Sequence, residues 1–482
     1  MMPPFRRAIG YLLPLAGALL VAGCTAGPNF TPPAAPATRH YTKGGDDITA
    51  GAQHVVPGQR VAVEWWRAFH SPRLDRVVTM ALAGNDGLAA ARATLAQARA
   101  ETQAATGALW PHISLGATAG RQKYGKSLFG PSDVVIPPFT YYTAGPQVSY
   151  LLDLAGGARR AVEERGALAR MRSFEADALR LSVTGDVVAR AFAIASARAE
   201  LAVIHRIVAA DRKTVSLVVE ARAAGSATVT DLLSAESQLA RDQTLEPPLQ
   251  QQLGEATRAL SILTGRAPAD WQPPAFTFAD FRLPAALPLS LPSELVRGRP
   301  DIMAAQARLH AASAAIGVAA ARLYPSLTLS ADTTQQALMV GHLFNPAANA
   351  WALAAGLTAP IFEGGRLRAE KRAAVAGYQA ALADYRQTVL RSFGQVADVL
   401  RALVHDDQEM RAQRHALDTA AAALRVARIS YRAGDTGILS VLDAERQYNQ
   451  ADLATTRVRA RRFQDTALLY LALGGGLLPA RG

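Results

Sequence analysis

Apolar residues recur every seven positions over a long stretch near the end of the chain. The stretch from Ile361 to Leu478 contains no proline, and its main apolar row is Val375, Leu382, Val389, Val396, Leu403, Met410, Leu417 and Leu424. This is the pattern of a supercoiled helix, and it predicts a helix from about Gly365 to Arg432, about 100 Å long. Residues 433–437 break the pattern, and a second helix is predicted to return to about Leu473. A hairpin of this length predicts packing against copies of itself in an elongated assembly.

Apolar and polar residues alternate in four other stretches. They lie at 113–119, 142–152, 327–331 and 349–359, and each is predicted to be a strand with one apolar face. Strands of about ten residues with this pattern have the length of an outer-membrane barrel wall. Four strands cannot close a barrel, and an open sheet edge in lipid leaves backbone groups without hydrogen bonds. We therefore expect other subunits to complete the sheet, three copies supplying twelve strands.

The remaining segments are mostly helical. A helix is predicted from Pro72 to Gly107 with a pause at 84–87, and a second very long helix runs from about Ala155 to Gly225. The returning helix, 229–263, is predicted to kink at Pro247-Pro248, because proline removes a helical hydrogen bond. Residues 25–59 have no periodicity and are predicted to form an extended strap, and 265–291 is a proline-rich connection.

The plan of elements occurs twice. The turn at Ala224-Gly225 corresponds to that at Ala433-Gly434 with an offset of 209 residues, and the same offset relates Gly265 to Gly474. Each half is predicted to contain a helix, two strands, a very long helix and a return helix. The predicted boundaries are a leader at 1–23, a strap at 24–64, a first repeat at 65–275, a linker at 276–291 and a second repeat at 292–475.

The predicted fold class is therefore a mixed α and β membrane protein with an internal two-fold repeat. Four strands per chain would contribute to a trimeric, twelve-stranded outer-membrane β-barrel. A long α-helical coiled-coil barrel would continue it, with the heptad seams facing neighbouring helices.

The N-terminus resembles a lipoprotein signal. Arg6 and Arg7 precede an apolar run that is too short for a comfortable membrane span and ends at Cys24, the only cysteine. We expect cleavage before Cys24 and acylation of its thiol and its new amino group, which would give stable anchoring. Thr25, rather than Asp, at the next position favours sorting to the outer membrane. The alternative is an uncleaved anchor with an incidental cysteine.

Composition adds little chemistry to this picture. The formal charge is +12, but the arginines are spread along helices between acidic residues, which does not indicate a nucleic-acid surface. The sequence contains no phosphate-binding loop, nucleophile elbow or zinc motif, so no enzyme, cofactor or metal site is predicted. The adjacent acidic pairs Asp406-Asp407 and Glu163-Glu164 are interpreted as solvated helix faces.

Several motifs together resemble the TolC-like outer-membrane efflux proteins, specifically their lipoprotein branch of the OprM/NodT type. The resemblance covers nearly all of the mature chain, and its most specific motifs are at 24–30, 65–69, 247–248, 291–295, 299–302, 324–327, 360–366 and 431–434. It implies a homotrimer with a 12-stranded β-barrel, a 12-helix periplasmic barrel and a small mixed equatorial collar. It also implies a periplasmic adaptor and an inner-membrane pump as partners.

The same resemblance points to a periplasmic gate just after the second-repeat turn, which contains Gly434 and Asp435 and corresponds to Gly225 in the first repeat. Leu439 would form a hydrophobic ring, and Asp443 and Arg446 a polar one. Their spacing of i, i+4 and i+7 places them on one helix face. The corresponding first-repeat residues are uncharged: Thr230, Ser234 and Ser237. The alternative is an ordinary exposed ion pair.

The predicted function is a passive exit duct in the outer membrane, through which a tripartite pump expels small molecules. Two alternatives remain from the sequence. One is the exit channel of a type I protein-secretion system. The other is a lipid-anchored coiled-coil scaffold without a pore, which would have no use for the four alternating strands.

Overall fold

The computed structural model describes residues 25–125 and 136–476, so the predicted leader and Cys24 lie outside the described residues. Two compact units are present. The first comprises the described residues of Met1–Pro33, Thr94–Arg172 and Ala305–Tyr385, and the second those of Ala34–Ala93, Ser173–Ala304 and Arg386–Gly482. Each unit therefore takes segments from both halves of the predicted repeat. The repeat boundaries remain a prediction.

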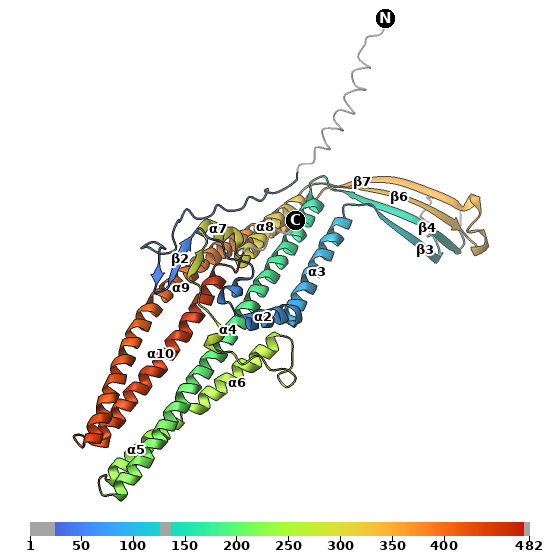
Figure 1. Ribbon diagram of the computed structural model, residues 1–482. Helices are drawn as coiled ribbons and strands as arrows, with labels where there is room; N and C mark the ends of the chain where they lie inside the picture. The colour runs from blue at the N-terminus through green and yellow to red at the C-terminus, as the bar shows by residue number, and fades with distance from the viewer. Residues whose placement is uncertain (1–24, 126–135, 477–482) are drawn as a thin grey trace. The chain divides into compact units, whose positions relative to one another are not determined.

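The four predicted strands are confirmed as one antiparallel sheet in the first unit (Figure 1). Its order is β3-β4-β6-β7, and the strands are β3 (His112–Gln122), β4 (Phe139–Leu152), β6 (Ser326–Ala337) and β7 (Asn349–Thr358). β3 and β4 extend beyond the predicted stretches, β3 to Gln122 at its end and β4 back to Phe139 at its start. Within the described residues, β3 and β7 are edge strands with no partner on their outer side.

One face of this sheet is apolar and exposed. The register aligns Ile113 with Val148, Val148 with Ala331, and Ala331 with Leu353, so an apolar row crosses all four strands. Ile113 and Leu353 are each 73% exposed in the single chain. Water does not favour such a surface, so this face requires lipid or protein against it.

Pro146 occupies an interior position of the sheet, where proline is rarely found because it cannot donate a backbone hydrogen bond. It pairs with Leu115 of β3, whereas the pairing of β4 to β6 is interrupted at Gly145 and Pro146. A Cβ atom at Gly145 would lie 2.0 Å from the carbonyl oxygen of Thr333. The sheet thus accommodates the proline by a local break and a close backbone approach.

Long helices account for most of the chain. Their bounds are α2 (Pro72–Gly84), α3 (Asp86–Gly107), α4 (Gly157–Ala223), α5 (Val229–Gln243), α6 (Glu246–Leu263), α7 (Pro292–Gly298), α8 (Pro300–Ala321), α9 (Arg366–Ala433) and α10 (Ile438–Ala472). Among the described residues, no helix combines the length and the apolar composition that a membrane crossing requires.

The prediction of one kinked helix at 229–263 is wrong. α5 ends at Gln243 and a separate helix, α6, begins at Glu246. Pro247 and Pro248 lie in the first turn of α6, where the missing N–H groups would have no intrahelical partner in any case. The prolines therefore start a helix here instead of bending one.

The strap and the connection also contain structure that the sequence analysis missed. β1 (Thr49–Ala50), β2 (Gln53–Pro57) and β5 (Ala286–Leu289) form a small mixed sheet in the second unit. β2 pairs in parallel with β5, with Val55 opposite Leu287. Strands of two to five residues are too short to produce a recognisable alternation, so the pairing of 49–57 in a sheet was not predicted.

An aromatic cluster fixes the core of the second unit. Phe69, from the short 3₁₀ helix η1 (Trp65–Phe69), packs edge-on against Phe192 of α4 with ring centroids 5.0 Å apart. Phe192 contacts Phe463 of α10 at 5.3 Å, and Trp65 stacks on Tyr470 at 5.6 Å. The heptad row of α9 joins the same core through Val396 and Leu403, so part of the predicted seam is buried within one chain.

Candidate functional site

The two hairpin turns have the same backbone geometry. Gly225 and Gly434 both have positive φ, +78° and +79°, which glycine adopts without steric cost. The N–H of Ser226 donates to Ala221 O and that of Asp435 donates to Ser430 O, each at 2.9 Å. These are Schellman caps, which satisfy the last carbonyls of α4 and α9. The sequence repeat at these turns is therefore also a structural repeat.

Gly434→Ala is expected to destabilise the second turn by about 1 kcal/mol, because a Cβ atom is unfavourable at positive φ. Gly394→Ala is the matched control. Gly394 lies inside α9 with nothing near its missing side chain, so alanine there should stabilise the helix by about 0.5–1 kcal/mol. Amide hydrogen exchange of α9 and α10 measures both changes. The same sign of effect for both variants would contradict this account of the turn.

Apolar side chains hold the two hairpins together near the turns. Val218 of α4, Ala235 of α5, Leu424 of α9 and Val441 of α10 belong to one buried cluster. Leu439 lies outside that cluster and is 51% exposed. The first turn of α10 thus has a buried face toward its own chain and an open face that carries Leu439.

Asp443 and Arg446 lie on the same open face of α10. Arg446 Nη2 donates to Asp443 Oδ1, and Gln447 Nε2 donates to Asp443 Oδ2 at 2.7 Å. About half of each charged side chain is exposed, so the ion pair contributes little to the stability of a single chain. In the first repeat, the Ser234 hydroxyl donates to Thr230 O within α5. The structure brings the three predicted gate residues to one face, and only the second repeat carries charge there.

Sequence reasoning missed a buried ion pair on the opposite face of α10. Glu445 is 5% exposed and accepts a hydrogen bond from Arg428 of α9 at 2.7 Å. The hydroxyl of Thr214 in α4 lies 3.5 Å from the other carboxylate oxygen. Glu445 therefore connects both hairpins. The only signal in the sequence was its place in the repeated motif, where Glu236 corresponds to it.

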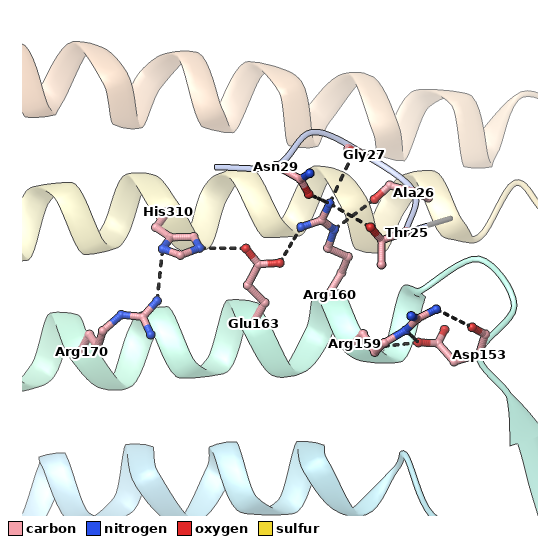
Figure 2. A network of polar contacts seen from close by, with 10 residues as sticks. All are labelled: Thr25, Ala26, Gly27, Asn29, Asp153, Arg159, Arg160, Glu163, Arg170 and His310. Carbon is pink, nitrogen blue, oxygen red and sulfur yellow. Dashed lines mark hydrogen bonds and ion pairs between the residues drawn. The ribbon is translucent and has the colours of Figure 1, made fainter. Parts of the chain in front are cut away.

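Figure 2 shows how the strap is held immediately after position 24. Arg160, in the first turns of α4, is 5% exposed. Its guanidinium donates hydrogen bonds to oxygen atoms of the strap: Ala26 O at 3.1 Å, Asn29 Oδ1 at 2.7 Å, and Thr25 Oγ1 and Gly27 O at 3.5 Å. A Cβ at Gly27 would lie 2.5 Å from Gly317 Cα of α8, so the strap and α8 touch through their glycines.

A second layer of contacts orients Arg160. Its Nη1 donates to Glu163 at 2.6 Å, and the other oxygen of Glu163 lies 2.8 Å from His310 Nε2 of α8 (Figure 2). Arg170 can only donate to His310 Nδ1, so the imidazole carries its proton on Nε2 and donates it to Glu163. Burial opposes the ionisation of Glu163, but the hydrogen bonds from His310 and Arg160 lower its pKa. The interpretation of Glu163 as a solvated residue is therefore wrong.

Arg160→Met should release the strap. It removes the charged donor that bonds to four strap oxygens, at a cost of about 1–3 kcal/mol, which corresponds to a roughly 5–150-fold larger detached population. Limited proteolysis with mass analysis of cleavage at 25–33 measures that population. Arg165→Met is the control, because Arg165 is half-exposed and bonds only loosely to Glu101, at 3.6 Å. Equal cleavage of both variants would show that Arg160 does not hold the strap.

A metal ion requires several ligating side chains arranged around one point. Within 25–125 and 136–476, no group of three or more His, Cys, Asp or Glu side chains is arranged to hold a metal ion. His405 contacts Gln408 on its own helix at 3.2 Å.

Comparisons with known proteins cover nearly the whole chain. A family model described as outer membrane efflux protein matches residues 77–266 and 291–475. The pyoverdine export outer membrane protein OpmQ of Pseudomonas putida is 32% identical over 476 residues, covering 96% of this chain and 97% of the relative. The toluene efflux pump outer membrane protein TtgF of Pseudomonas putida is 28% identical, covering 97% of each chain. The solved structure of the outer-membrane channel OprN has a TM-score of 0.87 at 28% identity and covers 94% of this chain and 99% of that one.

Proposed function

The chain belongs to the outer membrane efflux protein family, and we propose that it is the exit duct of a tripartite efflux system. It is an efflux protein of the outer membrane, as its relatives are. In the proposed system, an inner-membrane pump and a periplasmic adaptor deliver small molecules to the helical end of the channel. The pump supplies the energy, since the sequence of this chain contains no nucleotide-binding motif.

The observation that carries the proposal is the exposed apolar face of the four-stranded sheet, bounded by two open edges. Leu115, Trp351 and Leu357 are 81%, 71% and 69% exposed in the single chain. Lipid would cover this face, but lipid cannot satisfy the backbone groups at the edges of β3 and β7. Pairing β3 of one copy with β7 of the next would close the sheet. Three copies would give a twelve-stranded barrel, within the range of known outer-membrane barrels.

The long helices support the same trimer. Besides the buried rows, α4 and α9 carry large apolar side chains that the single chain leaves exposed, among them Leu217, Val219, Leu390, Val426 and Ile429. Exposed apolar side chains on long helices are typical of contacts between helices. Neighbouring copies would bury them and form a periplasmic helical tube.

The proposed gate is the ring formed by three copies of the open face of α10. Leu439 would block the axis with apolar side chains. Asp443 and Arg446, already within hydrogen-bonding distance of each other, would form a ring of alternating charge. Opening would then be an outward relaxation of the second-repeat hairpin.

The lipid anchor completes the proposal. Acyl chains on Cys24 would enter the membrane next to Thr25, which the structure holds against the β4–α4 junction: Ala26 N donates to Ala155 O at 2.8 Å. Mass spectrometry of the mature N-terminus tests the modification. An unmodified thiol or a retained leader would refute it.

Deletion of the gene, followed by profiling against a panel of compounds, tests the proposed function. Because two relatives are named for export of pyoverdine and toluene, the panel should include siderophores and organic solvents. We expect greater sensitivity to, or less export of, at least one small molecule, restored by the wild-type gene. Loss of a secreted protein with no change for any small molecule would favour protein secretion instead.

A further inference from the structure

A carboxyl group is buried without a partner between the two helices of the second hairpin. Asp406 of α9 is 3% exposed, and within the described chain its Oδ2 atom has no hydrogen-bond partner. Its neighbour across the interface is the carboxyl group of Asp465, in α10. The interpretation of Asp406-Asp407 as a solvated face is therefore wrong, because both residues are buried.

The charges around this pair do not neutralise it. Arg461 of α10 is close, but it bonds to Glu409 at 2.7 Å, and Glu409 adds a further negative charge on α9. Asp407, next in the sequence, is matched by Arg462 at 3.4 Å and Arg411 at 2.9 Å. Asp407 is thus a paired carboxylate, whereas Asp406 faces another acid.

The first hairpin contains the same arrangement. Asp211 of α4 is also 3% exposed with a buried, unpartnered Oδ2, and it faces the carboxyl group of Asp242 in α5. Asp242 accepts a hydrogen bond from Gln238 at 2.8 Å. Glu445 of α10 also faces Asp211, and Arg428 of α9 pairs with Glu445 at 2.7 Å. Again, among the residues that the structure describes, no cationic side chain is bonded to the buried acid.

The two acid pairs do not correspond in the repeat. With the offset of 209 residues, Asp211 and Asp242 correspond to Ala420 and Ala451, and Asp406 and Asp465 to Ala197 and Ala256. Each hairpin thus has alanines where the other has acids. An acid pair therefore occurs in each hairpin, but at a different distance from the turn. The alanines show that a small apolar residue fits the corresponding positions of the other hairpin.

We propose that each acid pair is a proton-binding site, in which one shared proton bonds the two helices of the hairpin at neutral and acidic pH. A protonated Oδ2 donates to the partner carboxylate, which satisfies the unpartnered atom and leaves one negative charge instead of two. Loss of the proton leaves two carboxylates facing each other in a buried site, and the helices then repel.

The electrostatics give the direction of the pH dependence. Burial, together with Asp465, raises the pKa of Asp406 from an ordinary 3.8 to about 7, although Arg461 opposes this. Burial, together with the negative charges of Asp242 and Glu445, raises the pKa of Asp211 to about 7 as well. A raised pKa means that the folded hairpin holds more protons than the unfolded chain. The stabilisation of the hairpin by the proton is therefore fully present below about pH 4 and is lost as the pH rises through 7, by up to about tenfold in the opening equilibrium per pH unit and site.

Infrared spectroscopy of the full-length protein in detergent tests the protonation directly. Protonated carboxylic acids absorb apart from carboxylates, so wild type should retain such absorbance at pH 6 and lose it by pH 9. Asp406→Asn and Asp211→Asn should each remove part of it, and Asp418→Asn, at an exposed site on α9, should not. Absence of the band at pH 6, or its full retention in both variants, would overturn the proposal.

Hydrogen exchange, corrected for the intrinsic pH dependence of amide exchange, tests the consequence. Wild-type hairpins should open more as the pH rises from 5 to 8. The double variant Asp406→Ala/Asp465→Ala, which copies the alanines of the first repeat, should fold and lose that dependence in α9 and α10 only. A pH dependence there equal to that of wild type would contradict the proposed link between the proton and the helices.

Discussion

Leu353→Arg is expected to prevent stable insertion of the protein into a membrane. Leu353 is near the middle of β7, on the apolar face of the sheet, and is 73% exposed in the single chain. An arginine facing lipid near the bilayer centre costs roughly 2–4 kcal/mol, and a trimer would carry three, so the total is roughly 6–12 kcal/mol. That is comparable to the whole folding stability of a typical domain. The measurement is the fraction of protein that resists extraction of membranes with urea.

Ala354→Arg is the control for this prediction. Ala354 is the next residue on the same strand, so its side chain is on the opposite face of the sheet, which would line the proposed channel. This variant should insert like wild type. If Leu353→Arg also inserts normally, or if both variants fail equally, then lipid does not cover the face that contains Leu353.

The double variant Asp443→Ala/Arg446→Ala should increase the open probability of the channel in planar bilayers. Exposed ion pairs contribute about 0.2–1 kcal/mol each, and three copies around one axis would favour the closed state by about 0.6–3 kcal/mol. Removing them therefore predicts a roughly 3–150-fold shift toward the open state. Trimer stability should be nearly unchanged, because both side chains are half-exposed in each chain.

Ser234→Ala/Ser237→Ala is the control for the gate, since these are the uncharged first-repeat positions on the corresponding face of α5. It should leave the open probability nearly as in wild type. A wild-type open probability in both double variants would place the constriction elsewhere in the channel and remove Asp443 and Arg446 from the proposed gate.

Sequence periodicity predicted the long elements because their signals extend over many residues. The alternation in β3, β4, β6 and β7 and the heptad row of α9 each repeat often enough to be recognised. The short strands β1, β2 and β5 gave no such signal, because they contain too few residues for an alternation to be recognised. In addition, β2 and β5 come from segments more than 200 residues apart. Their pairing depends on the tertiary structure.

The candidate site was predictable only where its residues share one helix. The common face of Leu439, Asp443 and Arg446 follows from helical spacing alone. The bond between Arg428 and Glu445 depends on the register between α9 and α10. The contacts of Arg160 depend on where the strap lies, and no pattern of residues near Arg160 encodes that position. For the same reason the burial of Asp406 was missed: what covers a helix face is decided by another helix.

The most direct test of the central claim is the number of chains in the purified, detergent-solubilised particle. Light scattering with correction for bound detergent gives the protein mass of that particle. The exposed apolar face and open edges of the sheet predict three chains per particle. A monomer would contradict the account, because a single four-stranded sheet cannot form a closed channel.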